Sequence, residues 1–277
     1  MANITASEVN KLRQMTGAGM MDCKQALVES DGDFEKAIDY LRKKGQKFAN
    51  KRADKEANEG IVLASTNDAH TFGIVARINC ETDFVAKNAE FVELANTFQA
   101  KALQAQIMSK EEALKMDING RNLEENLTEL IGKTGEKMEL SGYEAIEAPV
   151  VAAYNHMGNR LATLVAFNKT VENGPELARE IAMQVAAMNP VAVDANSVDQ
   201  ATIQRELEIG MEQARAEGKA ENMLEKIAQG KLNKFFKDST LLNQEFIRDS
   251  KKTVAQYLTG FDKDLTVKTF RRLQLGE

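Results

Sequence analysis

Cys80-Glu81-Thr82-Asp83-Phe84-Val85-Ala86-Lys87 is the stretch of the chain at which the spacing of apolar residues changes. Before it, residues from Phe72 to Cys80 alternate between two faces, and this two-residue period predicts a half-buried β-strand. After it, apolar residues fall on one face of a predicted helix. They are Phe91, Leu94, Ala95, Phe98 and Ala102. Asp83 and Phe84 therefore lie at or just after a strand-to-helix corner.

This corner favours binding over covalent chemistry. A carboxylate beside a large apolar ring is suited to insertion into another molecule. No histidine lies near it in the sequence to act as a general base. On pattern alone, a phenylalanine that follows a strand is usually part of the core, so a buried Phe84 is the competing interpretation.

Length and composition are those of an ordinary globular protein with room for two or three modules. The chain has 277 residues, of which 43% are hydrophobic and 28% charged. Its longest apolar runs fall short of a membrane span, and Met1–Thr5 lacks the charged and apolar regions of a signal peptide. We therefore expect a cytoplasmic protein. The net charge of −6 argues against a general nucleic-acid binder.

Cysteine and histidine are too sparse and too scattered for a metal site. The two cysteines, Cys23 and Cys80, lie in apolar patterns, which predicts buried free thiols and excludes a disulfide framework. The two histidines, His70 and His156, lie in predicted hairpin turns. We expect neither a bound metal nor a cofactor.

The first fifty or so residues predict three short helices in a compact bundle. Thr5 and Glu8 form a capping box for the first helix, and the second begins near Met20 after a glycine-rich break. Asp33 caps the third helix, and Gly45 is predicted to end it. The expected inward-facing residues are Val9, Leu12, Met15, Cys23, Ala26, Leu27, Phe34, Ala37, Ile38 and Leu41.

Two features of this region suggest contact with another molecule. Met20 and Met21 are adjacent at a helix start, so both cannot easily be buried. Methionine adapts to irregular partner surfaces, although core packing or incidental exposure is the alternative. A basic cluster also spans residues 42–55 and is either a solvated helical linker or a contact with RNA or the ribosome. Its members are Arg42, Lys43, Lys44, Lys47, Lys51, Arg52 and Lys55.

The middle of the chain predicts a hairpin followed by a helix, twice over. A third strand is expected at Lys137–Glu147, and a closing strand at Leu265–Leu275 is expected to return to the second sheet. The second helix has Pro175 in its first turn and stops before Pro190. The predicted hairpin strands are Ile61–Ser65, Phe72–Cys80, Val150–Tyr154 and Arg160–Phe167.

Residues 197–237 predict two helices around a break at Glu217-Gly218-Lys219. Each helix carries a narrow apolar stripe, which is typical of an antiparallel coiled-coil hairpin. Such a hairpin buries little surface on its own, so it is suited to packing on a partner or on a second copy. The sequence therefore predicts an α+β fold with an inserted helical hairpin.

No motif for covalent chemistry stands out. The glycine-rich break Thr16-Gly17-Ala18-Gly19-Met20 follows a helix and lacks the lysine of a nucleotide-binding loop, so it is interpreted as a tight turn. The acid pairs Glu111-Glu112 and Glu124-Glu125 lie in polar helical stretches and are interpreted as solvated.

Four segments, in order along nearly the whole chain, resemble the elongation factor Ts family. They are Leu12-Arg13 with Thr16–Lys24, Asn79–Ala86, Ile181–Ala186, and Gly230–Phe236 with Gln244–Ile247. The first two are long and specific. The resemblance implies a guanine-nucleotide exchange factor in translation elongation. Such a factor binds elongation factor Tu with GDP, promotes release of GDP and Mg²⁺ so that GTP can rebind, and performs no covalent chemistry.

The resemblance also implies a domain organisation. It implies a ubiquitin-associated-like (UBA-like) three-helix domain, a core of two subdomains with small antiparallel sheets packed by helices, and a coiled-coil hairpin. The expected ranges are 1–54 for the helical domain and linker, 55–147 for the first core subdomain, 148–196 and 238–277 for the second, and 197–237 for the hairpin.

The resemblance further assigns partner-binding roles. The residues expected to grip a helix of the GTPase domain are Arg13, Met20, Met21 and Lys24. Those expected to intrude beside the partner's Mg²⁺ and nucleotide are Thr82, Asp83, Phe84 and Val85. Those expected to touch another partner domain are His156, Arg160, Leu161, Ala162 and Ile247.

The sequence departs from many family members at Asn159, Ala162, Glu180 and Gln184. It stops at Gly276-Glu277 where some members continue into a terminal helix, so no grip from that helix is expected.

Two other functions compete with nucleotide exchange. One is a scaffold or RNA-binding module that uses residues 42–55, and the other is a thiol enzyme that uses Cys80. For the exchange factor itself, no direct contact with nucleic acid or membrane is expected. Both a homodimer through the coiled coil and a one-to-one heterodimer are compatible with the sequence.

Overall fold

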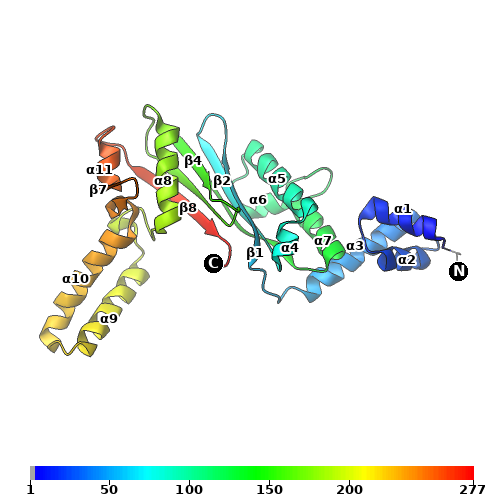
Figure 1. The fold of residues 1–277 in the computed structure, drawn as a ribbon, viewed down its shortest axis with the longest axis horizontal. Helices are drawn as coiled ribbons and strands as arrows, with labels where there is room; N and C mark the ends of the chain where they lie inside the picture. Colours follow the sequence, from blue (N-terminus) through cyan, green and yellow to red (C-terminus); the bar gives the residue numbers. More distant parts are fainter. Residues whose placement is uncertain (1–3) are drawn as a thin grey trace.

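The computed structural model describes residues 4–277 and consists of helices and two three-stranded antiparallel sheets, with a two-stranded hairpin in addition. The expected mixture of helices with small antiparallel sheets is confirmed. Residues 1–3, on which part of the signal-peptide argument rests, lie outside the described residues. The molecule is elongated, with three N-terminal helices at one end and a pair of long helices at the other (Figure 1).

The first sheet has the order β1-β2-β3, built from Glu59–Thr66, Phe72–Cys80 and Met138–Glu147. The three strands predicted here are confirmed. The prediction that the Phe72–Cys80 strand is half-buried is wrong, because all of its residues except Arg77 are buried. β2 is the central strand, and both of its faces are covered.

One face of the first sheet packs against helices. They are α5 (Ala89–Gln104), α6 (Lys110–Lys115) and α7 (Leu123–Thr134). Alternate residues of β2, such as Ile74 and Ile78, belong to the same core cluster as Phe91 and Phe98 of α5. The helix predicted to follow the corner is therefore confirmed, and its apolar face lies on the strand that precedes it.

The second sheet has the order β4-β5-β8, built from Val150–Asn155, Leu161–Phe167 and Val267–Gln274. The second hairpin and the closing strand are confirmed. α8 (Gly174–Met188), with Pro175 in its first turn, covers the outer face through Ile181 and Val185. α11 (Val254–Thr259) joins the same core through Leu258.

The two sheets lie face to face. Val62 and Val75 of the first sheet pack against Val151 and Leu164 of the second in a separate apolar cluster. The core is therefore layered as helices, sheet, sheet and helices, with α5–α7 on one side and α8 on the other (Figure 1). This second layer explains why β2 is buried on both faces.

The three expected N-terminal helices are α1 (Ala6–Thr16), α2 (Met20–Glu29) and α3 (Phe34–Lys51). The capping box of Thr5 and Glu8 and the cap by Asp33 are confirmed. Met15, expected to face inward, is exposed.

The expectation that Gly45 ends the third helix is wrong. α3 continues to Lys51, and Gly45 is buried where α3 crosses α7. A Cβ atom at Gly45 would lie 3.0 Å from the Thr128 carbonyl oxygen and 3.5 Å from the Gly132 Cα atom. The glycine therefore permits a close helix crossing, which joins the N-terminal helices to the core.

α9 (Gln200–Ala216) and α10 (Glu221–Ser239) form an antiparallel pair around the expected break. Gly210 of α9 lies against Ala228 of α10, where an added Cβ would approach the Ala228 Cα to 3.1 Å. The 3₁₀ turns Ala195–Ser197 and Leu241–Asn243 and the hairpin of β6 (Glu245–Phe246) and β7 (Asp249–Thr253) connect this pair to the second sheet. Among residues 4–277, no helix combines the length and apolarity that a membrane crossing requires.

Candidate partner-binding surface

The strand-to-helix corner is built by Thr82. Its backbone is extended, and its hydroxyl accepts a hydrogen bond from the Val85 amide, so it caps the single-turn helix α4 (Asp83–Ala86). Val85 turns inward and joins the core of the first sheet. The opposite side of this turn presents Phe84, whose side chain is 83% exposed. The structure therefore excludes a core role for Phe84.

Asp83 is exposed beside Phe84. Its carboxylate forms an ion pair with Lys87, with an Nζ–Oδ2 distance of 2.6 Å. The hydrogen bond from Lys87 and the charge of its ammonium hold the pKa of Asp83 below its usual range. The corner thus carries an ionised carboxylate, paired with Lys87, and an apolar ring on the same turn of chain.

The turn between β4 and β5 lies close to this corner. The Arg160 guanidinium pairs with Glu59, which stands opposite Cys80 in the β1–β2 ladder. The Val62 amide donates to the Asn159 carbonyl at 2.8 Å, which fixes the turn against β1. His156 is exposed and Leu161 is half-buried. The structure therefore brings the turn and the corner together, although they are far apart in sequence.

Two of the proposed contact residues have buried side chains. Ala162 is fully buried between the sheets, so a partner cannot reach its methyl group. Val85 is 8% exposed and anchors α4. Both positions support the surface from beneath, and direct side-chain contact with a partner is not expected at either.

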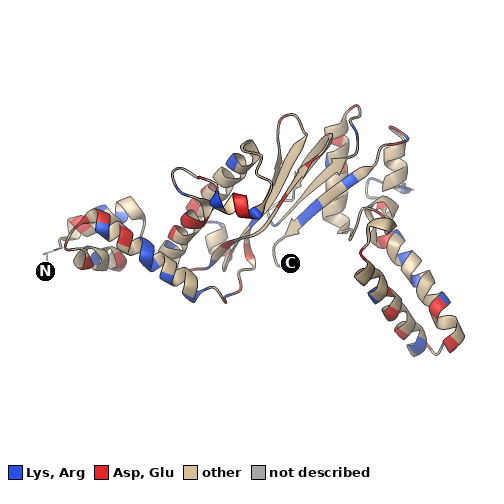
Figure 2. Ribbon diagram, turned by 180° about the vertical axis from the view of Figure 1, so that it is seen from behind, with Lys and Arg blue, Asp and Glu red and all other residues tan. Residues whose placement is uncertain are grey.

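The N-terminal candidates lie on separate helices at one end of the molecule. Met20 and Met21 are both exposed at the start of α2, and Met21 is 75% exposed. Lys24 follows one turn later on α2, and Arg13 is exposed in the last turn of α1. Basic and acidic residues are interspersed along these helices (Figure 2), so the exposed methionines lie among charged positions.

Ile247 lies at the tip of the β6–β7 hairpin and is 46% exposed. The fully buried Gln184 of α8 holds this tip, because its Oε1 accepts from the Ile247 amide at 2.8 Å and its Nε2 donates to the Glu245 carbonyl at 3.1 Å. Glu180, one turn earlier, pairs with Arg248. The two family departures on α8 therefore bind the hairpin that carries Ile247.

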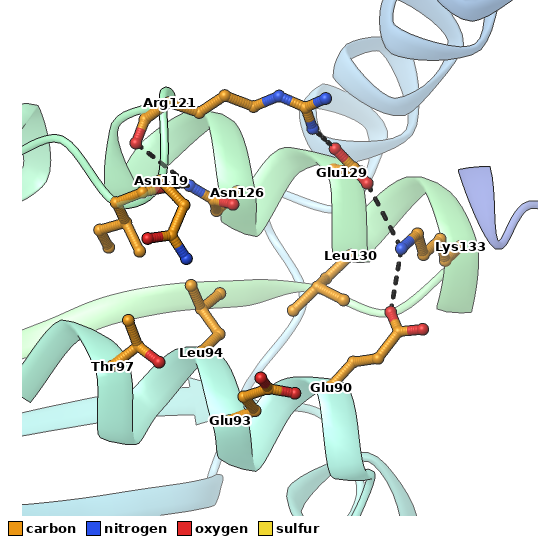
Figure 3. Close-up of a pocket in the computed structure, with 11 residues that line it drawn as sticks. Glu90, Glu93, Leu94, Thr97, Asn119, Arg121, Asn126, Glu129, Leu130 and Lys133 are labelled. Atoms are coloured by element: carbon orange, nitrogen blue, oxygen red, sulfur yellow. Dashed lines mark hydrogen bonds and ion pairs between the residues drawn. The ribbon is translucent and has the colours of Figure 1, made fainter. Parts of the chain in front are cut away.

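A hollow of about 280 Å³ lies between α5, α7 and the loop before α7 (Figure 3). Lys133 is bound by Glu90 at 2.9 Å and by Glu129 at 3.3 Å, and Arg121 also pairs with Glu129. The charged groups at its centre are thus bound to one another. The residues that line it include no histidine, cysteine or serine.

Cys80 lies directly beneath the corner and is inaccessible. Its thiol donates to the Thr82 carbonyl, with an Sγ–O distance of 3.2 Å. Burial, followed by the nearby carboxylates of Glu136 and Glu59, raises the pKa of Cys80 to about 12. A buried thiol with a raised pKa is a poor nucleophile, which argues against the thiol-enzyme interpretation.

We expect the native protein to resist thiol labelling. Cys23 is also fully buried, and burial raises its pKa, so at mildly alkaline pH both thiols are protonated and shielded. A thiol reagent should label neither cysteine in the folded protein and both in denaturant, as counted by mass spectrometry. Rapid labelling of Cys80 without denaturant would contradict this description.

Within residues 4–277, no group of three or more histidine, cysteine and acidic residues is placed to hold a metal ion.

The sequence did not reveal which distant residues support the corner. Arg52, at the end of α3, contacts Glu81 at 2.7 Å, and Thr82 is bound by Glu136. Arg52 falls within the basic cluster of residues 42–55, and no pattern in the sequence marks Glu136. α11 was also missed, although its capping box of Thr253 and Gln256 is a local signal that identifies its start.

The family model and the similar proteins that match this chain all carry the same name. The family model described as elongation factor TS matches residues 81–277. The elongation factor Ts of Christiangramia forsetii is 53% identical, with all of both chains covered, and that of Flavobacterium psychrophilum is 51% identical with the same coverage. The elongation factor Ts of Porphyromonas gingivalis is 51% identical over 99% of this chain and 98% of its own.

Proposed function

Because this chain belongs to the elongation factor Ts family, we propose that it is a guanine-nucleotide exchange factor of translation elongation. It binds elongation factor Tu with GDP, promotes release of GDP and Mg²⁺, and leaves when GTP rebinds. The observation that carries this proposal is the corner at the end of β2, where an 83% exposed Phe84 stands beside the ionised Asp83. An exposed aromatic ring beside a carboxylate is suited to insertion into a pocket of a partner.

Exchange requires no covalent step. A GTPase holds its nucleotide through phosphate contacts and a bridging Mg²⁺. A factor that binds the nucleotide-free state more tightly than the GDP-bound state weakens GDP binding by the same free energy, because the coupling is reciprocal. A thousandfold faster release requires a barrier lower by about 4 kcal/mol. Phe84 acts as a wedge between elements of the partner, and Asp83 rearranges the surroundings of the Mg²⁺.

The direct experiment is release of fluorescently labelled GDP from purified elongation factor Tu, followed after addition of excess unlabelled nucleotide. The wild-type chain should accelerate release in proportion to its concentration and then reach a plateau. No acceleration at any concentration would refute exchange activity. The plateau rate reports on the wedge at the corner. The half-saturating concentration reports on the surfaces that supply affinity for the partner.

The N-terminal helices supply part of that affinity. Arg13, Met20, Met21 and Lys24 lie on α1 and α2 and grip a helix of the GTPase domain in this proposal. The β4–β5 turn with His156, Arg160 and Leu161, and the hairpin tip at Ile247, contact another partner domain. Exposed methionines can conform to an apolar partner surface, while the two cations supply orientation.

We expect Met21→Ala to raise the half-saturating concentration of the factor by about tenfold, as is typical for an interface anchor. The plateau rate should change little, because Met21 lies on α2 and not at the corner. Met108→Ala is the matched control, since Met108 is also exposed but precedes α6 on another part of the molecule. Equal effects of the two substitutions would contradict a specific role for Met21.

The finer fold assignments are part of this proposal and are supported by membership of the family. α1–α3 form the UBA-like domain, the two sheets with their helices form the two core subdomains, and α9 with α10 forms the coiled-coil hairpin. The factor forms either a one-to-one heterodimer with elongation factor Tu or a homodimer through that hairpin. Nucleic acid takes no direct part in the exchange step.

The basic cluster gives little support to an RNA-binding alternative. Lys44 pairs with Asp22 at 2.6 Å, Arg52 pairs with Glu81, and Arg42 lies 3.7 Å from Asp39. These ion pairs reduce the positive field available to a phosphate backbone. Salt-sensitive RNA binding without any effect on GDP release would favour the alternative.

A further inference from the structure

Two short segments beside the corner hold each other through their carboxylates. The Glu81 Oε1 atom accepts a hydrogen bond from the Lys137 amide at 2.6 Å. In return, the Glu136 Oε2 atom accepts from the Thr82 amide at 3.2 Å, and both Glu136 oxygens lie within 3.0 Å of the Thr82 hydroxyl. Residues 81–82 and 136–137 thus form a reciprocal clasp, in which each segment supplies the carboxylate that binds the other's backbone.

The clasp begins where the sheet ends. The β2–β3 ladder stops at the pair Cys80 and Met138, and beyond it the chain turns outward into α4. The carboxylates therefore replace ladder bonds for the Thr82 and Lys137 amides, which would otherwise lose their partners. A single helical turn cannot stabilise itself. The orientation of α4, and with it the direction of Phe84, consequently depends on these contacts.

A third residue connects the clasp to the N-terminal helices. Arg52 directly follows α3 and places one guanidinium nitrogen 2.9 and 2.7 Å from the two Glu81 oxygens. The Glu81 side chain is 16% exposed and the Arg52 side chain 37%, so this contact is partly shielded from water. α3 is the helix on which α1 and α2 pack. The corner is therefore fixed relative to a second candidate contact surface.

We propose that Glu81 and Glu136 are positioning residues for exchange, which hold the 82–84 corner at a fixed projection, and that Arg52 ties this projection to the N-terminal helices. This inference rests on the proposed exchange function and deepens it. None of the three needs to touch the partner. They act through Thr82, whose hydroxyl and amide both contact Glu136 while it caps α4.

The expected signature is a lower plateau rate without a change in affinity. Glu136→Ala removes both contacts to Thr82, and we expect it to lower the plateau rate of GDP release by about tenfold, because small misplacements of a working group are costly. The half-saturating concentration should stay within about twofold, since the N-terminal helices and the β4–β5 turn keep their contacts. Glu136→Gln should retain most activity, because its amide can accept from the Thr82 backbone and donate to the hydroxyl.

Hydrogen exchange on the free factor gives a second readout that does not depend on elongation factor Tu. The amides of Val85 and Ala86, which bond to Thr82, should exchange faster in Glu136→Ala than in Glu136→Gln. Glu139→Gln is the control, because Glu139 lies in β3, three residues after Glu136, and its carboxylate pairs with Lys137 and not with Thr82. If Glu136→Ala does not fold, Arg52→Ala replaces it in the test. This substitution leaves the Glu136 contacts intact, so we expect a smaller loss of plateau rate.

The outcomes distinguish failure of the exchange function from failure of the positioning role. An inactive wild-type factor would refute exchange itself, whatever the hydrogen-exchange result. A wild-type factor that is active, with Glu136→Ala equally active and equally protected at residues 85–86, would overturn the positioning role alone. Loss of plateau rate in Glu136→Ala and Glu136→Gln alike would also overturn it, because the charge and not the clasp geometry would then matter.

Discussion

Phe84→Ala is expected to lower the plateau rate of GDP release by about 100-fold, which corresponds to a barrier to release that is about 2.7 kcal/mol higher than with the wild-type factor. The ring is the only large apolar group on α4 that faces solvent, because Val85 is buried in the core. Alanine cannot fill the space that the ring opens between elements of the partner. Stability should be unaffected, since the ring buries almost no surface in the free protein.

The measurement is labelled-GDP release at saturating factor, with Phe261→Ala as the control. Phe261 is also exposed, at 54%, but lies after α11 on another part of the molecule. Asp83→Ala in the same series should lose part of the acceleration, and the loss should shrink when Mg²⁺ is removed, because the carboxylate acts on the metal surroundings. Acceleration by Phe84→Ala within about twofold of wild type would rule out the wedge.

Gly60→Ala is expected to destabilise the fold by at least about 3 kcal/mol. Gly60 lies in β1 opposite Asn79 and has a φ of +140°. Residues other than glycine rarely adopt this backbone angle. A Cβ atom there would lie 2.1 Å from the Ile78 carbonyl oxygen and 2.8 Å from the Asn79 Cα atom. Both are backbone atoms of the central strand, so neither can move without breaking the sheet that supports the corner.

Gly230→Ala provides the matched control. Gly230 lies inside α10, has no positive φ, and has no atom within 4 Å of an added Cβ. Alanine should therefore stabilise this helix by about 0.5–1 kcal/mol. Chemical denaturation followed by circular dichroism compares the two variants. Equal denaturation midpoints for Gly60→Ala and the wild-type protein would show that β1 can relax away from β2.

Local sequence signals predicted most of the elements. The two-residue period located β2, and capping residues Thr5 and Asp33 located the starts of α1 and α3. Local signals could not predict which faces meet. β2 was expected to be half-buried because its alternation is visible locally, whereas the second sheet that covers its other face begins at Val150, far along the chain. The role of Gly45 cannot be predicted locally for the same reason, since its partner Gly132 lies on another helix.

The candidate site also has a part that the local sequence predicts and a part that only tertiary contacts define. The motif around Asp83 and Phe84 was recognised as a whole, but the pattern of apolar residues favoured a buried Phe84, and only the structure established its exposure. The clasp was invisible, because Thr82 and Glu136 are joined by a contact between segments 54 residues apart. Residues that position a functional group through tertiary contacts leave no periodic signal, and one of them, Arg52, was grouped with surface charges.

The affinity of this factor for elongation factor Tu, measured by calorimetry with the GTPase either nucleotide-free or saturated with GDP, tests the central claim most directly. Reciprocal coupling predicts that GDP weakens binding by about 100-fold, so that excess GDP dissolves the complex. The same affinity in both states would contradict the account, because a factor without preference for the empty GTPase cannot drive nucleotide release.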